Sequence, residues 1–418
     1  MQIVTDFKFK IYTWLIALAI CVYGFFGSLG HLFSILVVLA ILLFDWRLVW
    51  SGKCSRDALW LYVGLSFVFY FLLIRSGLTT SLSDLTFAAS PMFPVAFVGL
   101  IVLLSAKTGL SVAPKAIANF ACVGIIGVYI VFFILDALPN GLDIKNTGLR
   151  SGGRISLFTG NSIPFSTIVG GLSLLTLVGW HDRTVAGRIF SVSIAGLGAY
   201  AATVWAGSRG ATLGLAAASP FIIFHLTQSK NWTIVYLGAA LALTIALVAA
   251  QSAGLMNSSI LARIINGFET VLTGTNIDNS NYYRMNMWVS SIAAIGDAPF
   301  LGHGLTERFW AIKPHLPDGL NFKFSHSHND ILGSGVSGGL VGLLAALCSF
   351  LVMPLYVLLK RGISPDQKYL AFSLTSLYVV IANSNTIYFN DAASSFFAFS
   401  VALFYLIRTP QQPKAQAA

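Results

Sequence analysis

Long apolar windows dominate this sequence and leave little charge to cover a surface in water. Hydrophobic residues make up 56% of the 418 residues and charged residues only 10%, whereas a soluble domain carries roughly 25% charged residues. A helix of about 20 mostly apolar residues is long enough to cross a bilayer. Twelve such windows occur, near residues 11–29, 31–46, 58–75, 90–106, 114–137, 162–180, 188–206, 209–227, 232–253, 328–359, 367–385 and 391–408. The sequence therefore predicts an all-α, polytopic membrane protein with about 12 transmembrane helices.

Lysine and arginine orient the predicted helices, because basic residues are retained in short cytoplasmic loops. With the N-terminus inside, such loops and the two tails hold fifteen of the 25 basic residues. The other ten fall on the outer side or at its edge: Arg75, Lys145, Arg150, Arg154, Arg209, Arg263, Arg284, Arg308, Lys313 and Lys323. This distribution predicts two cytoplasmic termini. The expected surroundings are a lipid bilayer, and no nucleic-acid partner is expected.

Two outer segments, about 138–161 and 254–327, are longer than a turn between helices requires. Long loops on a rigid scaffold often carry function. The expected organisation is nine transmembrane helices in 1–253, a periplasmic loop with amphipathic helices in 254–327, three transmembrane helices in 328–408 and a cytoplasmic tail in 409–418. Within the loop, apolar side chains recur at helical spacing over 260–272, which predicts a helix lying on the membrane or capping the bundle.

Several short motifs follow one another in and after the second outer segment. Arg284 and Trp288 are four residues apart and would share a helix face. Pro299, Gly302 and Gly304 come next in a Pro-x-x-Gly-x-Gly pattern. The sequence His-Asn-Asp at 328–330 then precedes a Gly-x-x-Gly pattern at 339–342, in a run of small residues suited to close helix packing.

This order of motifs before a late apolar window resembles the O-antigen ligase and polymerase superfamily of bacterial inner-membrane glycosyltransferases. The resemblance implies a GT-C-like fold with its active site facing the periplasm. It also implies a glycan donor linked to undecaprenyl diphosphate and an acceptor hydroxyl on a sugar of lipid A core. The expected enzyme is an inverting glycosyltransferase that needs neither a metal nor a cofactor.

Arg209 and Arg284 are the predicted diphosphate-binding residues. Cleavage of a sugar–phosphate bond places negative charge on the leaving diphosphate, and a guanidinium can contact phosphate oxygens through two donors. Arg209 lies in Gly-Ser-Arg-Gly between two apolar windows, where the amides of a helix N-terminus would add to an anion site. The family resemblance also places a functional arginine at both positions. The plainer explanations are snorkelling to the interface for Arg209 and a solvated loop helix for Arg284.

His328 is the predicted general base. The acceptor hydroxyl must lose its proton as it attacks the anomeric carbon, and a neutral imidazole can accept that proton near neutral pH. A position at the start of a helix would disfavour the imidazolium form. A metal site made by His326, His328 and Asp330 is not expected, because residues two apart on a helix point to nearly opposite faces.

The remaining candidates for substrate binding have structural alternatives. They are Arg150 and Arg154 in an Arg- and Gly-containing segment, His326 and Asn329 beside the predicted base, Trp288, and Asp391 in the last outer turn. Trp288 would equally suit an aromatic belt at the membrane interface. Asn390 and Asp391 would equally suit a helix cap.

Three other functions share part of this pattern. An O-antigen polymerase and a protein O-oligosaccharyltransferase would use the same diphosphate site and base, and the late position of the single large outer loop favours a ligase. A transporter or flippase of lipid-linked glycan would also fit twelve helices. Against a transporter, the windows carry few charges and show no paired half-repeats.

Overall fold

A computed structural model of the chain describes residues 56–78, 80–92, 111–137, 150–151, 154–159, 161–229, 279–317 and 327–407, with short pieces at 14–16, 18–23, 36, 39–40, 94–95, 103, 231 and 234. The helices are α3 (Arg56–Gly77), α4 (Leu82–Ala89), α6 (Pro114–Phe132), α8 (Ser162–Leu175), α9 (Val185–Tyr200), α10 (Arg209–Thr227), α13 (Asn279–Asp297), α14 (Arg308–Ile312), α15 (Asp330–Phe350), α16 (Val352–Leu359), α17 (Pro365–Ser384) and α18 (Asp391–Leu406). The shorter elements are 3-10 turns η1 (Ser90–Met92), η3 (Leu157–Thr159), η4 (Trp180–Asp182) and η6 (Lys313–His315), π-helical turns η2 (Phe133–Ala137) and η5 (Ala201–Trp205), and an antiparallel pair of two-residue strands, β1 (Arg150–Ser151) and β2 (Arg154–Ile155).

The predicted helical, membrane-spanning class is confirmed for these residues. Among the described residues, five helices are long and apolar enough to cross a membrane by length and composition: α3, α6 with part of η2, α9 with η5, α10 and α15, the last counted across a break at Gly339. The apolar helices α8 and α18 are shorter. The windows at 31–46, 90–106 and 232–253, the helix at 260–272 and the tail at 409–418 lie largely or wholly outside the described residues, so the full set of twelve helices and the periplasmic loop stay predictions.

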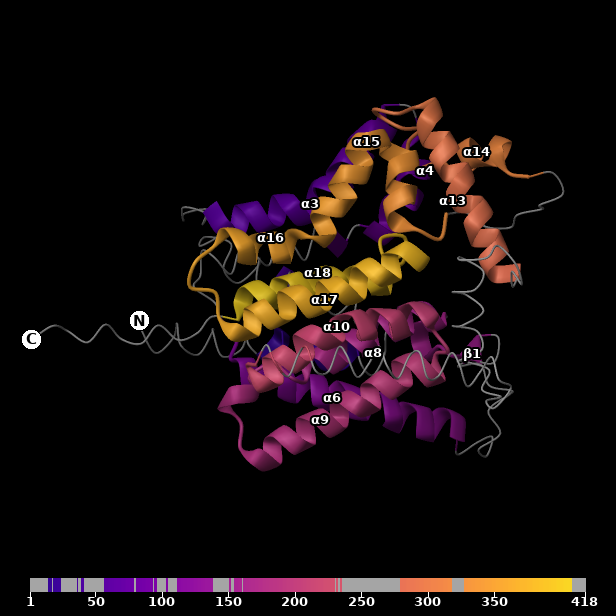
Figure 1. The fold of residues 1–418 in the computed structure, drawn as a ribbon. Helices are drawn as coiled ribbons and strands as arrows, with labels where there is room; N and C mark the ends of the chain where they lie inside the picture. Colours follow the sequence, from indigo (N-terminus) through magenta and orange to yellow (C-terminus); the bar gives the residue numbers. More distant parts are fainter. Residues whose placement is uncertain are drawn as a thin grey trace, which may run out of the picture.

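Helix α17 lies at the centre of the bundle, and three helices run antiparallel to it (Figure 1). In α10, Gly214 packs against Leu377 in the middle of α17. Tyr369, near the start of α17, donates to the Leu174 carbonyl near the end of α8 at 2.9 Å. Tyr378 of α17 and Ser400 of α18 share a 2.8 Å hydrogen bond. The N-termini of α8, α10 and α18 therefore all lie at the end of the bundle where α17 finishes.

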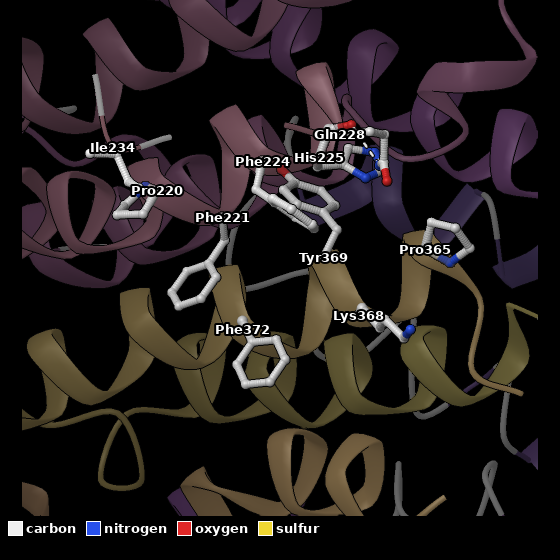
Figure 2. Close-up of a pocket in the computed structure, with 10 residues that line it drawn as sticks. All are labelled: Pro220, Phe221, Phe224, His225, Gln228, Ile234, Pro365, Lys368, Tyr369 and Phe372. Atoms are coloured by element: carbon white, nitrogen blue, oxygen red, sulfur yellow. Dashed lines mark hydrogen bonds between the residues drawn. The ribbon is translucent and has the colours of Figure 1, made fainter. Parts of the chain in front are cut away.

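At the other end of α17, the groove between α10 and α17 opens into a largely apolar pocket of about 620 Å³ (Figure 2). Phe221 of α10 stacks on Phe372 of α17 with ring centroids 5.3 Å apart. His225 and Tyr369 stack in the same way at 4.3 Å and form one wall. This pocket belongs to the end of the bundle opposite to the predicted site.

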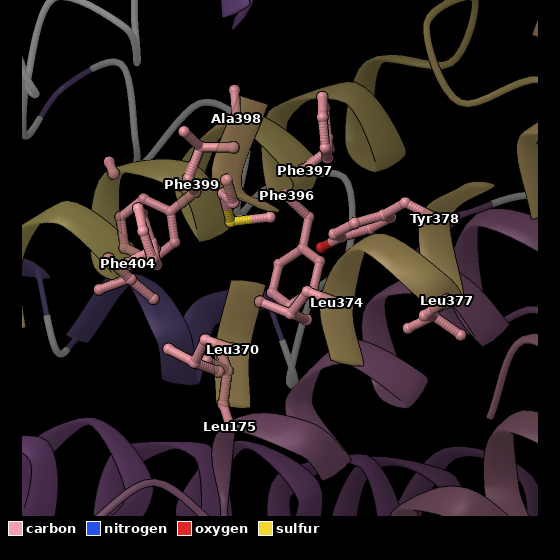
Figure 3. Close-up of a cluster of buried hydrophobic side chains, with 14 of the residues drawn as sticks. Leu175, Leu370, Leu374, Leu377, Tyr378, Phe396, Phe397, Ala398, Phe399 and Phe404 are labelled. Carbon is pink, nitrogen blue, oxygen red and sulfur yellow. The ribbon is translucent and has the colours of Figure 1, made fainter. Parts of the chain in front are cut away.

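The core between α8, α17 and α18 is filled by aromatic and leucine side chains (Figure 3). Phe397 contacts Tyr378 edge to face at 4.8 Å, and Phe396 packs so closely on α8 that only glycine fits at position 171. Such close packing makes these helices a rigid support for the ends that carry polar groups.

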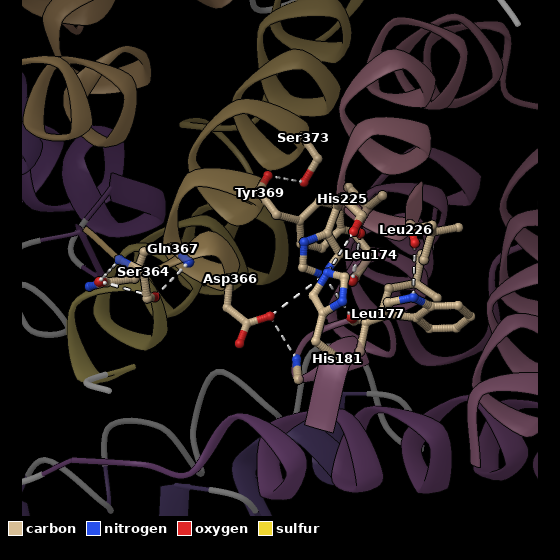
Figure 4. A network of polar contacts seen from close by, with 12 residues as sticks. Leu174, Leu177, His181, His225, Leu226, Ser364, Asp366, Gln367, Tyr369 and Ser373 are labelled. Atoms are coloured by element: carbon tan, nitrogen blue, oxygen red, sulfur yellow. Dashed lines mark hydrogen bonds and ion pairs between the residues drawn. The ribbon is translucent and has the colours of Figure 1, made fainter. Parts of the chain in front are cut away.

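A polar network ties the start of α17 to the loop after α8 (Figure 4). Asp366 accepts a hydrogen bond from the Gly179 amide at 2.8 Å and lies 3.5 Å from Nε2 of His225. Ser364 caps α17 together with Gln367 in a capping box. These contacts use side chains that no sequence motif singled out, and they fix the end of the bundle away from the predicted site.

Helix α15 is broken at Gly339, which corrects the expectation of one long helix over 328–359. Gly339 has φ 60° and ψ −151°, outside the helical region. After the break the chain folds back, so that Gly342 lies against the carbonyl of Ser334 (Figure 1). The apolar window therefore forms two short arms followed by α16. Hydropathy alone missed the break because both arms are apolar.

The predicted Pro-x-x-Gly-x-Gly motif fills this break. Gly302, with φ 59°, approaches so closely that a Cβ atom there would overlap the amide nitrogens of Gly338 and Gly339. Both a positive φ and backbone contact require glycine at such a position. The two glycine motifs of the sequence thus meet, and their role is structural.

Gly302→Ala is expected to destabilise the folded protein by on the order of 3 kcal/mol, because the methyl group adds strain and overpacking. Thermal unfolding of the detergent-purified protein measures the change. Gly296→Ala in α13 is the matched control, since a methyl group there would meet no atom within 4 Å and the φ of Gly296 is ordinary. The control should be neutral or slightly stabilising. Equal melting temperatures for the Gly302→Ala variant and the wild type would contradict the proposed contact.

Candidate active site

His328 lies immediately before the cap of α15, in a left-handed backbone conformation with φ 51°. A non-glycine residue in this region costs about 1–3 kcal/mol and is found more often at functional sites. The imidazole is partly buried and hydrogen-bonds the side chain of Asn385. Burial lowers the pKa of His328, and the nearby charge of Arg284 lowers this pKa further. The ring is therefore held in its neutral form, as a general base requires.

The two residues after His328 anchor it to the end of α17. Asn329 is the N-cap of α15, and its Oδ1 accepts from the amides of Ile331 and Leu332 at 3.0 Å. Its Nδ2 donates to the Asn383 carbonyl at 3.3 Å. Asn329 is buried, so its contacts favour a positioning role over the predicted role in substrate binding.

Asp330 is fully buried and holds the turn that follows α17. Its Oδ2 accepts from the amides of Ile387 and of Tyr388, the latter at 3.1 Å. This turn begins at Asn385, the residue that hydrogen-bonds His328. The His-Asn-Asp motif therefore combines one side chain available for chemistry with two that fix its surroundings.

Arg284 reaches this place from a different element, α13. Its guanidinium is partly buried and lies close enough to His328 for their charges to interact. Trp288 lies one turn further along the same helix and is also partly buried. Its Nε1 is buried and has no hydrogen-bond partner among the described residues. The structure thus brings together Arg284 and His328, which are 44 positions apart in the sequence.

Arg209 is the first residue of α10, at the same end of the bundle. Gly207 turns the chain with φ 56°, and Ser208 caps the helix by accepting from the Ala211 amide at 3.3 Å. Gly210 packs against Ser384, the last residue of α17. Ser384 directly precedes Asn385, so Arg209 and His328 lie around the same helix end.

Four helices begin at this end of the bundle with polar caps. The cap residues are Asn161 of α8, Ser208 of α10, Asn329 of α15 and Asn390 of α18. Each helix N-terminus carries a partial positive charge, and the arginines add full charges. The end of α17 is therefore surrounded by groups that attract an anion, next to a neutral imidazole that can accept a proton.

Sequence reasoning did not single out two residues that this site uses. Asn385 lies in the turn between two apolar helices and belongs to none of the sequence motifs. Arg308 was one of ten outer basic residues, yet its guanidinium carbon lies 3.8 Å from the centre of the Phe389 ring and its charge faces Asp330. Burial lowers the pKa of Arg308 to about 10. Its position in the predicted loop gave no indication of this pairing.

The remaining residues predicted to bind substrate lie in different parts of the chain. Arg150 and Arg154 lie on β1 and β2, with Arg150 opposite Ile155, and β2 contacts α8. His326 lies outside the described residues. Asp391 is exposed in the first turn of α18, while Asn390 caps that helix by accepting from the Ala393 amide at 3.0 Å, which confirms the predicted cap. Among the described residues, no group of three His, Cys, Asp or Glu side chains could hold a metal ion.

The fold and the site define a helical protein with several candidate membrane spans, in which arginine and histidine side chains lie near one end of the bundle. Residues 190–347 match the family model described as O-antigen ligase. The match covers less than half of the chain, and it shows that this segment is similar to the O-antigen ligase superfamily, whose members are membrane-integral, glycosyltransferase-like enzymes. The matched segment contains Arg209, Arg284, His328 and both glycine motifs. No curated protein matches the chain.

Proposed function

We propose that the protein is an O-antigen ligase, which transfers a glycan from undecaprenyl diphosphate to a sugar hydroxyl of lipid A core at the periplasmic face of the inner membrane. The observation that carries the proposal is the pairing of Arg284 with His328 within the family-matched segment. A cation for the leaving diphosphate and a neutral base for the acceptor are the two groups that such a transfer needs.

The proposed step is a single displacement at the anomeric carbon. His328 takes the proton of the acceptor hydroxyl, whose oxygen forms the new glycosidic bond. The bond between the anomeric carbon and the phosphate oxygen breaks, and its electron pair leaves with undecaprenyl diphosphate. Arg209, Arg284 and the helix N-termini stabilise the charge that develops on this leaving group. Attack from the side opposite to the leaving group inverts the anomeric configuration.

The residues around His328 have distinct roles in this proposal. Asn385 orients the imidazole through its hydrogen bond. Asn329 and Asp330 fix the backbone on either side of that bond. Trp288, partly exposed one helix turn from Arg284, offers a flat apolar surface on which a sugar ring can stack.

Reconstitution of the purified protein in liposomes tests the proposal. We expect glycan from the lipid diphosphate donor to be joined to added lipid A core, with release of undecaprenyl diphosphate. Donor alone should remain intact. Growth of the glycan on the donor lipid, with no product on lipid A core, would identify a polymerase instead. Movement of intact donor between leaflets without cleavage would identify a transporter.

A further inference from the structure

The segment that follows α13 holds α13 and α15 in one fixed arrangement. We call residues 298–306 the joint segment. It lies in the break of α15, where the amides of His303 and Gly304 donate to the carbonyls of Val336 and Ser337 at 2.9 and 2.8 Å. The Leu340 amide donates back to the Pro299 carbonyl at 2.7 Å. Because α13 carries Arg284 and the first arm of α15 begins just after His328, this segment sets the position of one relative to the other.

The joint segment is fastened on its other side by the end of α3. Arg75 donates from Nε to the Leu301 carbonyl at 3.1 Å and from Nη2 to the Gly302 carbonyl at 3.0 Å. Ser76 Oγ accepts from the Leu305 amide at 2.7 Å. Arg75 is the charged member of this contact, and its planar guanidinium matches two consecutive carbonyls, which a lysine ammonium cannot do in the same way.

The support behind Arg75 is rigid. Helix α3 packs along α15 on both sides of its break, where Gly338 and Gly342 lie against Leu72. Ser349 also donates to the Leu65 carbonyl at 3.1 Å. Arg75, which extends from this helix, therefore fixes the position of the joint segment relative to the bundle. Through the joint segment it also fixes the position of α13.

We propose that Arg75 is a positioning residue for glycan transfer, which holds the joint segment so that Arg284 stands beside His328. The inference rests on the function proposed above. Loss of the two hydrogen bonds leaves the carbonyls of residues 301 and 302 without these donors, and the segment can shift. A misplacement of about 1 Å can lower the rate of an enzyme roughly 100-fold.

The pH dependence of transfer reports the distance between Arg284 and His328. The charge that faces His328 is that of Arg284 from α13, whereas Asp330 and Arg308 face each other and Arg209 begins α10 beside the end of α17. Activity falls when the base becomes protonated, below its pKa. If Arg284 moves away, the pKa of His328 rises, so the fall in activity on the acid side moves to higher pH.

The experiment compares kcat/KM against pH for the reconstituted wild type and five variants. Arg75→Gln is expected to lower kcat about 10- to 100-fold. It should also move the acid limb of the pH profile, which is the fall in activity on the acid side, to higher pH, as Arg284→Gln does. In an Arg284→Gln background, Arg75→Gln should add no further movement of that limb. For Arg75→Lys, both kcat and the position of the acid limb should lie between those of the wild type and those of Arg75→Gln. Arg56→Gln, at the exposed opposite end of α3, should match the wild type.

The outcomes separate this inference from the proposed function. An unmoved acid limb in both Arg75 variants, with Arg284→Gln moving it as expected, would overturn the positioning role alone. Full activity of the Arg284→Gln and His328→Gln variants would overturn the proposed function itself. Ser76→Ala, which removes the bond to the Leu305 amide and leaves Arg75 in place, provides a second variant if Arg75→Gln does not fold. Its acid limb should also move to higher pH, by a smaller amount than that expected for Arg75→Gln. An unmoved acid limb in a folded Ser76→Ala protein would count against the proposal.

Discussion

His328→Gln is expected to lower the rate of glycan transfer by about 10²- to 10⁴-fold while the protein keeps its fold. Glutamine retains a polar group that can meet Asn385, but it cannot accept a proton near neutral pH. The acceptor hydroxyl would then attack without a base. Transfer of a labelled glycan to lipid A core, followed with saturating donor, measures the effect.

A second histidine of the same region serves as the control for this prediction. His315 lies in η6, and its Nε2 is 2.7 Å from Asp297 Oδ2 in a pair that is partly open to solvent. His315→Gln should leave the rate close to that of the wild type, since a polar contact that is partly open to solvent contributes little. If His328→Gln and His315→Gln were equally active, His328 could not be the base.

Loss of either Arg209 or Arg284 should have the next largest effect. We expect Arg209→Gln and Arg284→Gln each to lower kcat by on the order of 10²- to 10³-fold, because each removes charge stabilisation of the departing diphosphate. The decrease should fall mainly on kcat, since the negative charge on the leaving group increases in the transition state. Lysine at either position should recover only part of the rate, because an ammonium cannot donate in a planar fork.

An arginine at the opposite end of the bundle provides the comparison for these variants. Arg361 is exposed in the short connection between α16 and α17, at the end of α17 opposite to the site. Arg361→Gln should transfer glycan at the wild-type rate. Unchanged kcat in both the Arg209→Gln and Arg284→Gln proteins, with donor still bound, would show that the diphosphate is held elsewhere.

The sequence predicted the helices of the described residues well, because apolar windows of fixed length follow directly from the bilayer. The expected windows at 58–75 and 209–227 correspond to α3 and α10 within two residues. The ordered motifs also predicted a site that includes Arg284 and His328, and the structure brings Arg284 close enough for its charge to lower the pKa of His328. Periodicity and motif order are local properties, so the sequence displays both.

The parts that the sequence missed depend on contacts between distant segments. The break at Gly339 requires the joint segment to insert, and nothing within 328–359 signals this. Asn329 was expected near substrate, but its side chain also donates to the Asn383 carbonyl at the end of α17, a contact across 54 positions that no local pattern reveals. Asn385 lies in a turn 57 positions from His328, and Arg75 lies at a helix end 253 positions from it. Neither belongs to a recognisable sequence motif.

The four capped helix starts around the end of α17 have a consequence for how the protein meets its substrate. Each carries a partial positive charge of roughly half an elementary charge from its backbone, which offsets the partial negative charge at the end of α17 and which no side-chain substitution removes and no change of pH titrates. A protein that has lost one guanidinium should therefore still draw polyanionic lipids toward this end of the bundle. Rising ionic strength, in contrast, should weaken the attraction in every variant alike.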